Sequence, residues 1–249
     1  VHGAVSGDPF VIAPPSMPYL AASGTDPGKL RIAVSYTAPS GRQIDPEVRL
    51  TLERTADLLA AHGHEVEEAR PIYDWDALVD ALLVTAAAGM ANRIDGIAKA
   101  RGCTPSTDLL QHTSYDAYRY GKELSATHLV KAMEHLDAVS RAVGPFFDRY
   151  AIHLTPSSIC PAPPHGTHDA DTKGLAPRQW SDIIHAEDCF LLLANVTGHP
   201  AISLPLGETD QGMPIGVQLE AGFGRETLLF QVAAQLEKAL PWTDRRPAI

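Results

Sequence analysis

Periodic apolar positions predict a strand–helix–strand unit near the start of the chain. Residues 30–36 alternate between apolar and polar side chains, which is typical of a strand. Asp45 and Pro46 favour a helix start, because an acidic N-cap accepts a free backbone N–H and proline suits the first helical position. An apolar stripe over 48–59 predicts one buried helix face, and residues 64–69 predict a second strand. This order indicates two parallel strands joined by a crossover helix.

Helical periodicity dominates the middle of the chain. Three segments follow residues that commonly open helices, namely Asp74, then Pro105 or Ser106, and then Ser125. We expect helices over about 75–101, 106–121 and 126–144, with a short helical piece to 150, and then a strand at 152–154. The middle section is therefore predicted to be mostly helical before the chain returns to a sheet.

The last third of the chain predicts a loop, a helix, a β-hairpin and a final helix. Residues 156–179 are rich in Pro, Gly, His and Asp, and loops of this length are usually functional or mobile. Ser181 is predicted to open the next helix, which should end at Gly198 because glycine suits a left-handed stop and Pro200 blocks further helix. The remaining elements are expected at 201–204 (strand), 207–214 (turn), 215–219 (strand) and 226–240 (helix).

Composition and charge argue against several classes of protein. A net charge of -10 over 249 residues disfavours a nucleic-acid surface, which needs clustered Lys and Arg. No apolar run is expected to span a bilayer, and residues 1–10 lack the pattern of a signal peptide, so we expect no membrane association. Cys103, Cys160 and Cys189 are far apart and odd in number, which fits neither a disulfide framework nor a zinc cluster. We therefore expect a cytoplasmic protein.

An ordered set of residues begins at Asn195 and continues into the final helix. It comprises Asn195, Thr197, Gly198, Pro200 and Ala201; Ser203, Pro205 and Gly207; Met213, Pro214, Gly216 and Gln218; and Glu226, Leu228 and Leu229. This run resembles the C-terminal signature of the amidase signature hydrolases, in which a helix, a turn and two strands lead into a helix. Looser matches precede it in the family's order, at 30–33, 45–48, 123–126, 147–156 and 161–163. The resemblance therefore covers nearly the whole chain.

The resemblance implies a fold and a domain organisation. It implies an α/β fold with a mixed sheet and helices on both faces, corresponding to the C-terminal portion of the family's fold. Residues 1–29, rich in Pro, Gly and Ser, are expected to form an extended arm from a missing N-terminal half. Residues 30–249 are expected to form the C-terminal half of the domain. The chain begins at Val1 rather than at methionine, so we expect a fragment or a processed product.

The resemblance also implies a chemistry whose residues are absent from this sequence. In the family, a lysine relays protons through a bridging serine to a nucleophilic serine, and a Gly-Ser-rich loop binds the oxyanion. No Gly-Ser-Ser or Gly-Gly-Ser loop occurs here, and Ser157-Ser158, the one adjacent pair, lacks flanking glycines. No catalytic residue can be assigned, so the chain alone is expected to be inactive as an amidase. The intact enzyme is implied to hydrolyse a linear or cyclic amide without a metal or an organic cofactor.

This half is expected to supply a wall of the substrate pocket and part of the scaffold. Ala88 and Gly89 lie in a run of small residues that would let a ligand approach, although tight helix packing is the simpler explanation. Ser158 and Cys160 are candidates because of the length and family position of their loop. The expected partners are a small-molecule amide, the missing N-terminal catalytic half and, as a further option, a second copy in a homodimer.

Other clusters have simpler explanations than a site. Residues 165–171 offer His and Asp side chains, but their spacing is not a zinc signature, and a solvated loop is expected. Cys160 could pair with His165 or His185 as thiol and imidazole, yet nothing in the sequence brings them within reach. Tyr115 and Tyr118 share a helix face, which favours core or subunit-contact packing.

Two alternatives to the amidase hypothesis stay open at this point. One is a non-catalytic remnant or assembly subunit that keeps the fold and binds a partner. The other is an independent cysteine hydrolase that uses Cys160.

Overall fold

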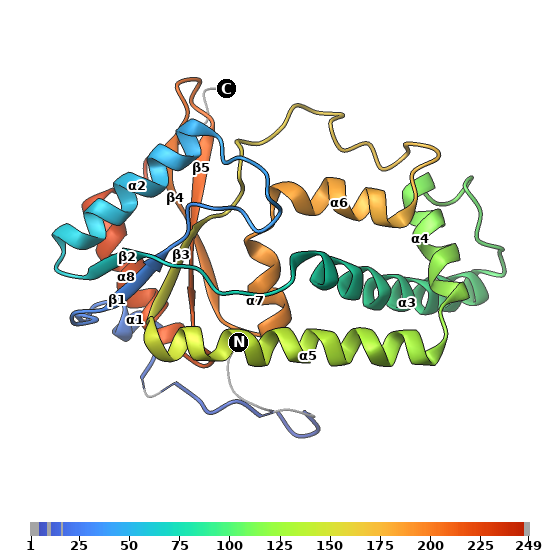
Figure 1. The fold of residues 1–249 in the computed structure, drawn as a ribbon, viewed down its shortest axis with the longest axis horizontal. Helices are drawn as coiled ribbons and strands as arrows, with labels where there is room; N and C mark the ends of the chain where they lie inside the picture. The colour runs from blue at the N-terminus through green and yellow to red at the C-terminus, as the bar shows by residue number, and fades with distance from the viewer. Residues whose placement is uncertain (1–4, 9–10, 16, 247–249) are drawn as a thin grey trace.

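A five-stranded mixed sheet forms the centre of the structure (Figure 1). The computed structural model describes residues 5–8, 11–15 and 17–246. The strands lie in the order β2 (Glu65–Glu68), β1 (Arg31–Val34), β3 (Ile152–Pro156), β5 (Pro214–Ala221) and β4 (Ala201–Glu208). β1 runs parallel to β2 and β3, whereas β5 runs antiparallel to β3 and β4. The predicted parallel pair, the hairpin and the mixed sheet are confirmed.

The crossover between β1 and β2 is the helix α2 (Pro46–Ala61), as the sequence predicts. Asp45 Oδ1 accepts the backbone N–H of Glu47 at 2.8 Å, which satisfies a donor that the helix leaves free. Gly63 follows the helix with a φ of 93°, a left-handed conformation that residues with a Cβ rarely adopt. These two local signals fix where the crossover begins and where it turns back to the sheet.

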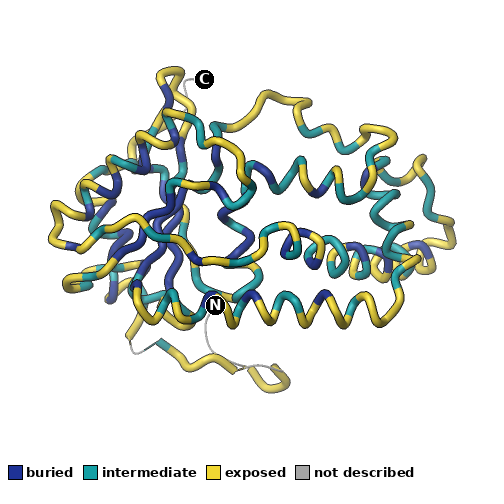
Figure 2. Tube along the Cα trace, viewed as in Figure 1, coloured by how far each residue is buried: buried dark blue, intermediate teal, exposed yellow. Residues whose placement is uncertain are grey.

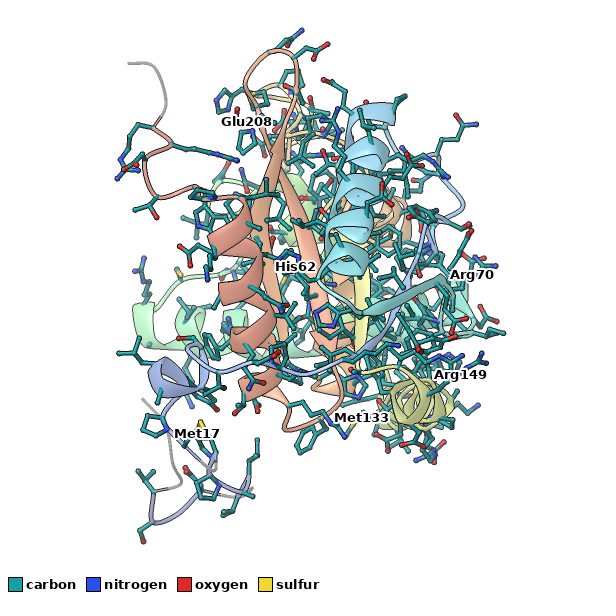
Figure 3. The ribbon with its side chains drawn as sticks, turned by 90° about the vertical axis from the view of Figure 1, so that its left-hand side faces the viewer. Met17, His62, Arg70, Met133, Arg149 and Glu208 are labelled. Carbon is teal, nitrogen blue, oxygen red and sulfur yellow. The ribbon has the colours of Figure 1, made fainter. Side chains whose placement is uncertain are left out.

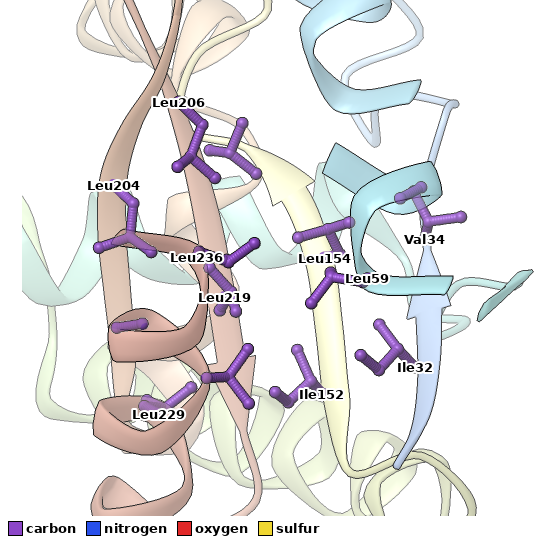
Figure 4. Packing of buried hydrophobic residues seen from close by; sticks show 14 of the residues in the cluster. Ile32, Val34, Leu59, Ile152, Leu154, Leu204, Leu206, Leu219, Leu229 and Leu236 are labelled. Atoms are coloured by element: carbon purple, nitrogen blue, oxygen red, sulfur yellow. The ribbon is translucent and has the colours of Figure 1, made fainter. Parts of the chain in front are cut away.

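One face of the sheet carries the main apolar core. Figure 3 shows α2 and α8 (Glu226–Ala239) side by side over the same strands. The core that they cover includes Ile32, Leu59, Ile152, Leu154, Leu219 and Leu236, all almost fully buried (Figure 4). Each such side chain contributes about 1.5–3 kcal/mol through burial, so this layer is the main source of stability on this side.

The opposite face of the sheet is polar and is also covered by helices. Strand alternation turns His153, Gln218 and Glu220 to this face, and all three are buried. α7 (Leu191–Thr197) and the end of α5 (Ala126–Arg149) lie over it, since Phe146 stacks edge-on against His153 with ring centroids 5.2 Å apart. The predicted helices on both faces are confirmed, but the second face packs polar groups rather than an apolar layer.

A helical layer extends away from this polar face. It consists of α3 (Trp75–Arg101), α4 (His112–Glu123), α5 and α6 (Pro177–Glu187) (Figure 1). The three inner strands β1, β3 and β5 are mostly buried, while long stretches of α3 and α5 are exposed (Figure 2). α3 and α4 approach closely at Gly121, where a Cβ atom would overlap the carbonyl oxygen of Ala87. A small residue is therefore required at this crossing.

Replacing Gly121 by alanine is expected to lower the free energy of unfolding by about 1–3 kcal/mol, because the added methyl group must displace the α3 backbone. Gly96→Ala is the matched control, since Gly96 lies on the open surface of α3 and an added Cβ would meet nothing within 4 Å. The control should instead gain up to about 1 kcal/mol from the better helix propensity of alanine. Urea denaturation of both variants measures the difference, and equal effects would contradict the packing argument.

Several predicted boundaries in the helical layer were wrong. The second middle helix begins at His112 and not at Pro105 or Ser106, because loop residues supply its cap: His112 N–H donates to Asp171 Oδ1 at 3.1 Å. α5 continues through Pro145 to Arg149, where the sequence predicts an interruption. The aromatic contacts of Phe146 and Phe147 with His153 and His199 hold this last turn against the sheet.

The helix before the signature also differs from its prediction. It starts at Pro177 instead of Ser181, with proline at its first position. It then breaks into α6 and α7 around Cys189, where the carbonyl of Glu187 accepts the N–H of Ile159 at 2.9 Å. β4 is longer than predicted and reaches Glu208 after a register shift between Leu204 and Gly207.

By length and composition α3 could cross a membrane, contrary to the expectation from the sequence. Its residues 75–101 pack against α4, α5 and α6. A core helix of a soluble protein meets the same criteria, so this helix is weak evidence for a membrane span. The apolar side chains of α3 are covered in part by the helices that pack against it.

The N-terminal arm contains one short helix, α1 (Tyr19–Ala22), which packs on α8. The ring of Tyr19 lies 4.9 Å from that of Phe230, and Gln231 Nε2 donates to Thr25 Oγ1 at 2.7 Å. Residues 1–4, 9–10, 16 and 247–249, which belong to the predicted arm and C-terminal half, lie outside the described residues. The division at residue 29 stays a prediction.

Candidate functional site

An apolar pocket of about 540 Å³ lies between the helices of the helical layer. We call it the helical pocket; α3, α4, α6 and α7 supply its walls. Its lining is Leu82, Leu83, Thr85, Ala86, Ala87, Met90, Thr113, Ser114, Ala117, Pro177, Trp180, Ser181, Ile184, His185, Leu192 and Asn195. No lysine, arginine or carboxylate lines it, so it suits an uncharged ligand with an apolar body.

The small-residue segment of α3 lines this pocket, but through other residues than the two predicted. Thr85, Ala86 and Ala87 form part of the wall, whereas Ala88 and Gly89 do not contact it. Ala88 is half-buried and Gly89 is exposed. The sequence identified the segment, but which of its residues line the pocket depends on how α4, α6 and α7 pack against α3.

The other two predicted pocket residues lie in a separate place. Ser158 and Cys160 follow β3, and Cys160 packs against an apolar cluster that contains Ile159, Cys189 and Phe190. The Ser158 hydroxyl accepts the backbone N–H of Cys160 at 3.4 Å. Ser158 and Cys160 therefore lie where the end of β3 packs near the start of α7, and neither residue lines the helical pocket.

Cys160 and Cys189 are poorly suited to act as nucleophiles. Burial raises the pKa of the Cys160 thiol, and burial likewise raises the pKa of the Cys189 thiol. A thiolate is the reactive form, so desolvation of the thiol works against nucleophilic chemistry. Cys160 makes no hydrogen bond to His165 or His185 among the described residues, where its nearest polar partner is Ser158 Oγ at 3.8 Å.

The histidines and acids of the long loop bind different partners. His168 Nε2 lies 3.1 Å from Glu187 Oε2, while Asp171 accepts from His112 Nδ1 at 2.9 Å. Hydrogen bonding by His112 lowers the pKa of the Asp171 carboxyl. Within the described ranges no three such side chains converge as metal ligands. These residues tie the loop to α4 and α6.

A buried network on the polar face of the sheet is the strongest cluster of titratable groups. Glu220 is fully buried, with Oε1 3.0 Å from His199 Nδ1 and Oε2 3.5 Å from His153 Nδ1. On the far side of its ring, His153 Nε2 lies 2.8 Å from Ser35 Oγ. Burial tends to raise the pKa of Glu220, but the adjacent imidazoles of His153 and His199 hold it below its usual range. Of the two, only His199 is hydrogen-bonded to the carboxylate, because Glu220 Oε2 and His153 Nδ1 have no hydrogen-bond partner among the described residues.

The sequence patterns did not predict this network. Register explains how it assembles, because His153 pairs with Glu220 across the antiparallel β3–β5 ladder. The available signal was a single ionisable residue in each of two apolar strands, His153 in Ile152–Pro156 and Glu220 in Pro214–Ala221. A buried charge is almost always paired, so the two residues could have been proposed as partners.

The outer edge of β4 lacks a partner strand in the described part of the chain. Ala221 N–H donates to Pro200 O, so the even-numbered positions of β4 bond to β5 and those of Ala201 and Ser203 point outward. No charged residue precedes Glu208 in this strand. The opposite edge, β2, carries three glutamates, which discourage strand pairing. One edge is therefore open and the other is protected.

The fold and sequence agree with known amidases. The sequence model of the amidase family matches residues 6–230. The 6-aminohexanoate-cyclic-dimer hydrolase of Pseudomonas sp. (strain NK87) is 33% identical over 257 residues, covering 100% of this chain and 52% of that protein. The corresponding hydrolase of Paenarthrobacter ureafaciens is 32% identical with the same coverage.

Solved structures extend this agreement. A 6-aminohexanoate cyclic dimer hydrolase complexed with substrate matches with a TM-score of 0.89 at 31% identity, covering 98% of this chain and 52% of that chain. A bacterial aryl acylamidase, with a TM-score of 0.78 and 18% identity over 100% of this chain and 52% of that chain, shares the fold. The chain spans about half the length of the curated relatives that it matches. By its sequence match and its fold, the chain belongs to the amidase signature family.

Proposed function

We propose that the intact protein hydrolyses amide bonds of small molecules by Ser–Ser–Lys chemistry located outside this chain. The observation that carries the proposal is the match to the amidase family over residues 6–230, with relatives named as amide hydrolases that are about twice as long. The Ser157 and Ser203 hydroxyls bond to each other, but no lysine contacts either among the described residues. This chain therefore contributes scaffold and pocket wall, and is inactive as an amidase by itself.

The helical pocket is the part of this chain that we assign to the substrate. Its apolar walls and few hydroxyl and amide groups suit a neutral aliphatic or aromatic amide, linear or cyclic. The relatives named as cyclic-dimer hydrolases act on a cyclic substrate by their printed name, which agrees with this choice. Residues 82–90 of α3 would then position the substrate body rather than take part in bond cleavage.

The missing catalytic half is the partner that we assign to the open edge of β4. An added strand would find the outward groups of Ala201 and Ser203 unpaired and no charge before Glu208. Near the other end of the strand, Arg245 Nη1 already donates to Pro205 O at 3.0 Å. The free edge is thus limited to about residues 201–204. A homodimer through the same edge is the competing use of this surface.

Mixing this chain with the N-terminal half of a family member tests the function. Amide hydrolysis, followed by release of the amine, is expected for the mixture and not for this chain alone. Replacing the nucleophilic serine of the added half should abolish turnover. Turnover that survives this replacement would overturn the Ser–Ser–Lys assignment, and the absence of both binding and turnover would favour a non-catalytic remnant.

Filling the helical pocket tests its role in the same mixture. Ala86→Trp places a large side chain on an exposed part of the pocket wall, so we expect KM to rise by about 10-fold or more with a smaller change in kcat. Ala100→Trp, on an exposed position at the end of α3, is the control and should leave both constants unchanged. If Ala86→Trp and Ala100→Trp had the same KM and kcat, the helical pocket would not be part of the substrate site.

A further inference from the structure

The buried network has the order of groups found in serine hydrolases. Ser35 Oγ lies 2.8 Å from His153 Nε2, within the distance at which an imidazole can take a hydroxyl proton. The opposite ring nitrogen, Nδ1, faces Glu220 Oε2 at 3.5 Å. The three side chains come from the end of β1, from β3 and from β5, which are neighbours in the sheet. The sheet therefore brings hydroxyl, imidazole and carboxylate side by side.

The carboxylate determines which nitrogen of His153 carries the proton. Glu220 is ionised at neutral pH, since the adjacent imidazoles of His153 and His199 keep the pKa of its carboxyl low despite burial. A carboxylate oxygen facing Nδ1 favours the tautomer with hydrogen on Nδ1. Nε2 then presents a lone pair to Ser35. The single hydroxyl hydrogen of Ser35 has two acceptors in reach, this lone pair and the carbonyl of Ala69 at 3.0 Å.

A cavity of about 230 Å³ opens onto Ser35 and His153. Its walls are mainly apolar and include Pro39, Pro71, Trp75, Phe190 and Leu193. Ser35 directly follows β1 and Arg70 lies just after β2, so the cavity lies at the carboxyl ends of these two parallel strands, where α/β proteins commonly bind ligands. The volume admits a short acyl group, and the apolar walls disfavour a charged one.

A cation lines the same cavity. Arg70, labelled in Figure 3, is exposed at the cavity rim and forms no ion pair within the part of the chain that the structure describes. Its guanidinium can stabilise negative charge that develops on a carbonyl oxygen inside the cavity. Tyr73 lines the same space, and burial raises the pKa of its hydroxyl, so it stays a neutral hydrogen-bond donor.

We propose that Ser35, His153 and Glu220 form a second acyl-transfer site, specific for activated esters of short uncharged acyl groups. Ser35 Oγ bonds to the acyl carbon while its proton passes to His153 Nε2. The ester C–O bond breaks, and the leaving alkoxide takes that proton from His153. Water then attacks the acyl-serine, gives a proton to His153, and the carboxylic acid leaves as the proton returns to Ser35 Oγ. Glu220 acts as a positioning residue throughout.

This site is independent of the proposed amidase function. Its groups all belong to this chain, whereas the amidase chemistry is assigned to the missing half. The two proposals can therefore be tested separately. Ester turnover by this chain alone tests the ester site, and amide hydrolysis by the mixture of halves tests the amidase function.

Turnover of 4-nitrophenyl acetate by this chain tests the proposal. We expect release of nitrophenol above the buffer rate, and an acetyl group on the peptide that contains Ser35 in mass spectra of quenched samples. Ser35→Ala should lose both signals. Ser140→Ala is the matched control, because the Ser140 hydroxyl bonds to two helix carbonyls, Leu136 O and Val196 O, and the variant should react like the unchanged protein.

The Glu220→Gln variant tests whether Glu220 orients His153 for the reaction or only stabilises the fold. We expect the acetylation rate to fall by about 10²–10⁴-fold and its pH profile to change, because the amide no longer selects the Nδ1–H tautomer. Thermal melting shows whether Glu220→Gln folds. If it does not fold, the proposal is tested by the activity of Ser35→Ala and by the acetyl group mapped to Ser35. Ester turnover that persists in folded Ser35→Ala, or the absence of acetyl-Ser35 in the unchanged protein, would overturn the proposal.

Discussion

Replacing Glu220 by alanine is expected to lower the free energy of unfolding by about 3–5 kcal/mol, as for other buried pairs that lose one partner. The side chain is fully buried and accepts from His199 Nδ1 at 3.0 Å. Its loss leaves His199 Nδ1 without its partner, removes the carboxylate that faces His153 and opens a cavity beneath α5 and α7. Chemical denaturation, compared with the unchanged protein, measures the effect.

Glu208→Ala is the control for this prediction. Glu208 lies at the exposed end of the neighbouring strand β4 and should change stability by less than about 0.5 kcal/mol. A double variant with His199→Ala then tests the contact itself: its cost should be well below the sum of the two single costs. Additive costs would show that the two residues stabilise the fold independently.

Acidity should weaken the stabilisation by Glu220. Its pKa is lower in the folded chain than in the unfolded chain, so its contribution is full above the ordinary glutamate pKa of about 4. The contribution is lost as the pH falls through the lower, folded value, because the unfolded state then binds the proton first. The stability difference between the unchanged protein and Glu220→Gln should therefore shrink below about pH 4. A constant difference down to pH 2 would contradict this.

Ser203→Pro is expected to weaken binding of the N-terminal half to this chain by at least about 10-fold. Ser203 presents its N–H outward from the open edge of β4, so proline removes a donor that an added strand would use. An acceptor left unpaired in an interface costs about 1–3 kcal/mol. The β4–β5 ladder should persist, because its bonds use the alternate positions Ile202 and Leu204. Titration of one half with the other measures the affinity.

Ser203→Ala separates the backbone from the side chain in this experiment. It removes the hydroxyl that bonds to Ser157 but keeps the backbone N–H. The affinity should stay within about 3-fold of the unchanged chain if the edge pairs through its backbone. Equal loss in both variants would point to the hydroxyl pair, and no loss in either would place the partner on another surface.

Local sequence signals identified most elements because each depends on neighbouring residues. Asp45 and Asp74 cap α2 and α3 through their own side chains, and Ser125 forms a capping box with His128. Gly198 ends α7 in the left-handed conformation with a φ of 71°. Such signals are readable from the sequence because both partners lie within a few residues.

Boundaries that depend on distant residues were not predictable in this way. The start of α4 is set by Asp171, which lies 59 residues later, and the last turn of α5 is held by His153 and His199. That Ala88, Gly89, Ser158 and Cys160 line the substrate pocket stays a prediction. Thr85, Ala86 and Ala87 line the helical pocket, and only the packing of α4, α6 and α7 against α3 decides which positions of this segment do so.

The sequence by itself determined the family, the strand and helix order, and the absence of the family's serine loop from this chain. These follow from ordered motifs and short-range caps, which are properties of neighbouring residues. The tertiary structure alone decided the polar face of the sheet. His153 and Glu220 are 67 positions apart in the numbering, and only the β3–β5 register brings them together with Ser35 beneath one cavity. Long-range pairing, unlike a cap, has no local signature, because its two partners are chosen by the packing of the whole sheet.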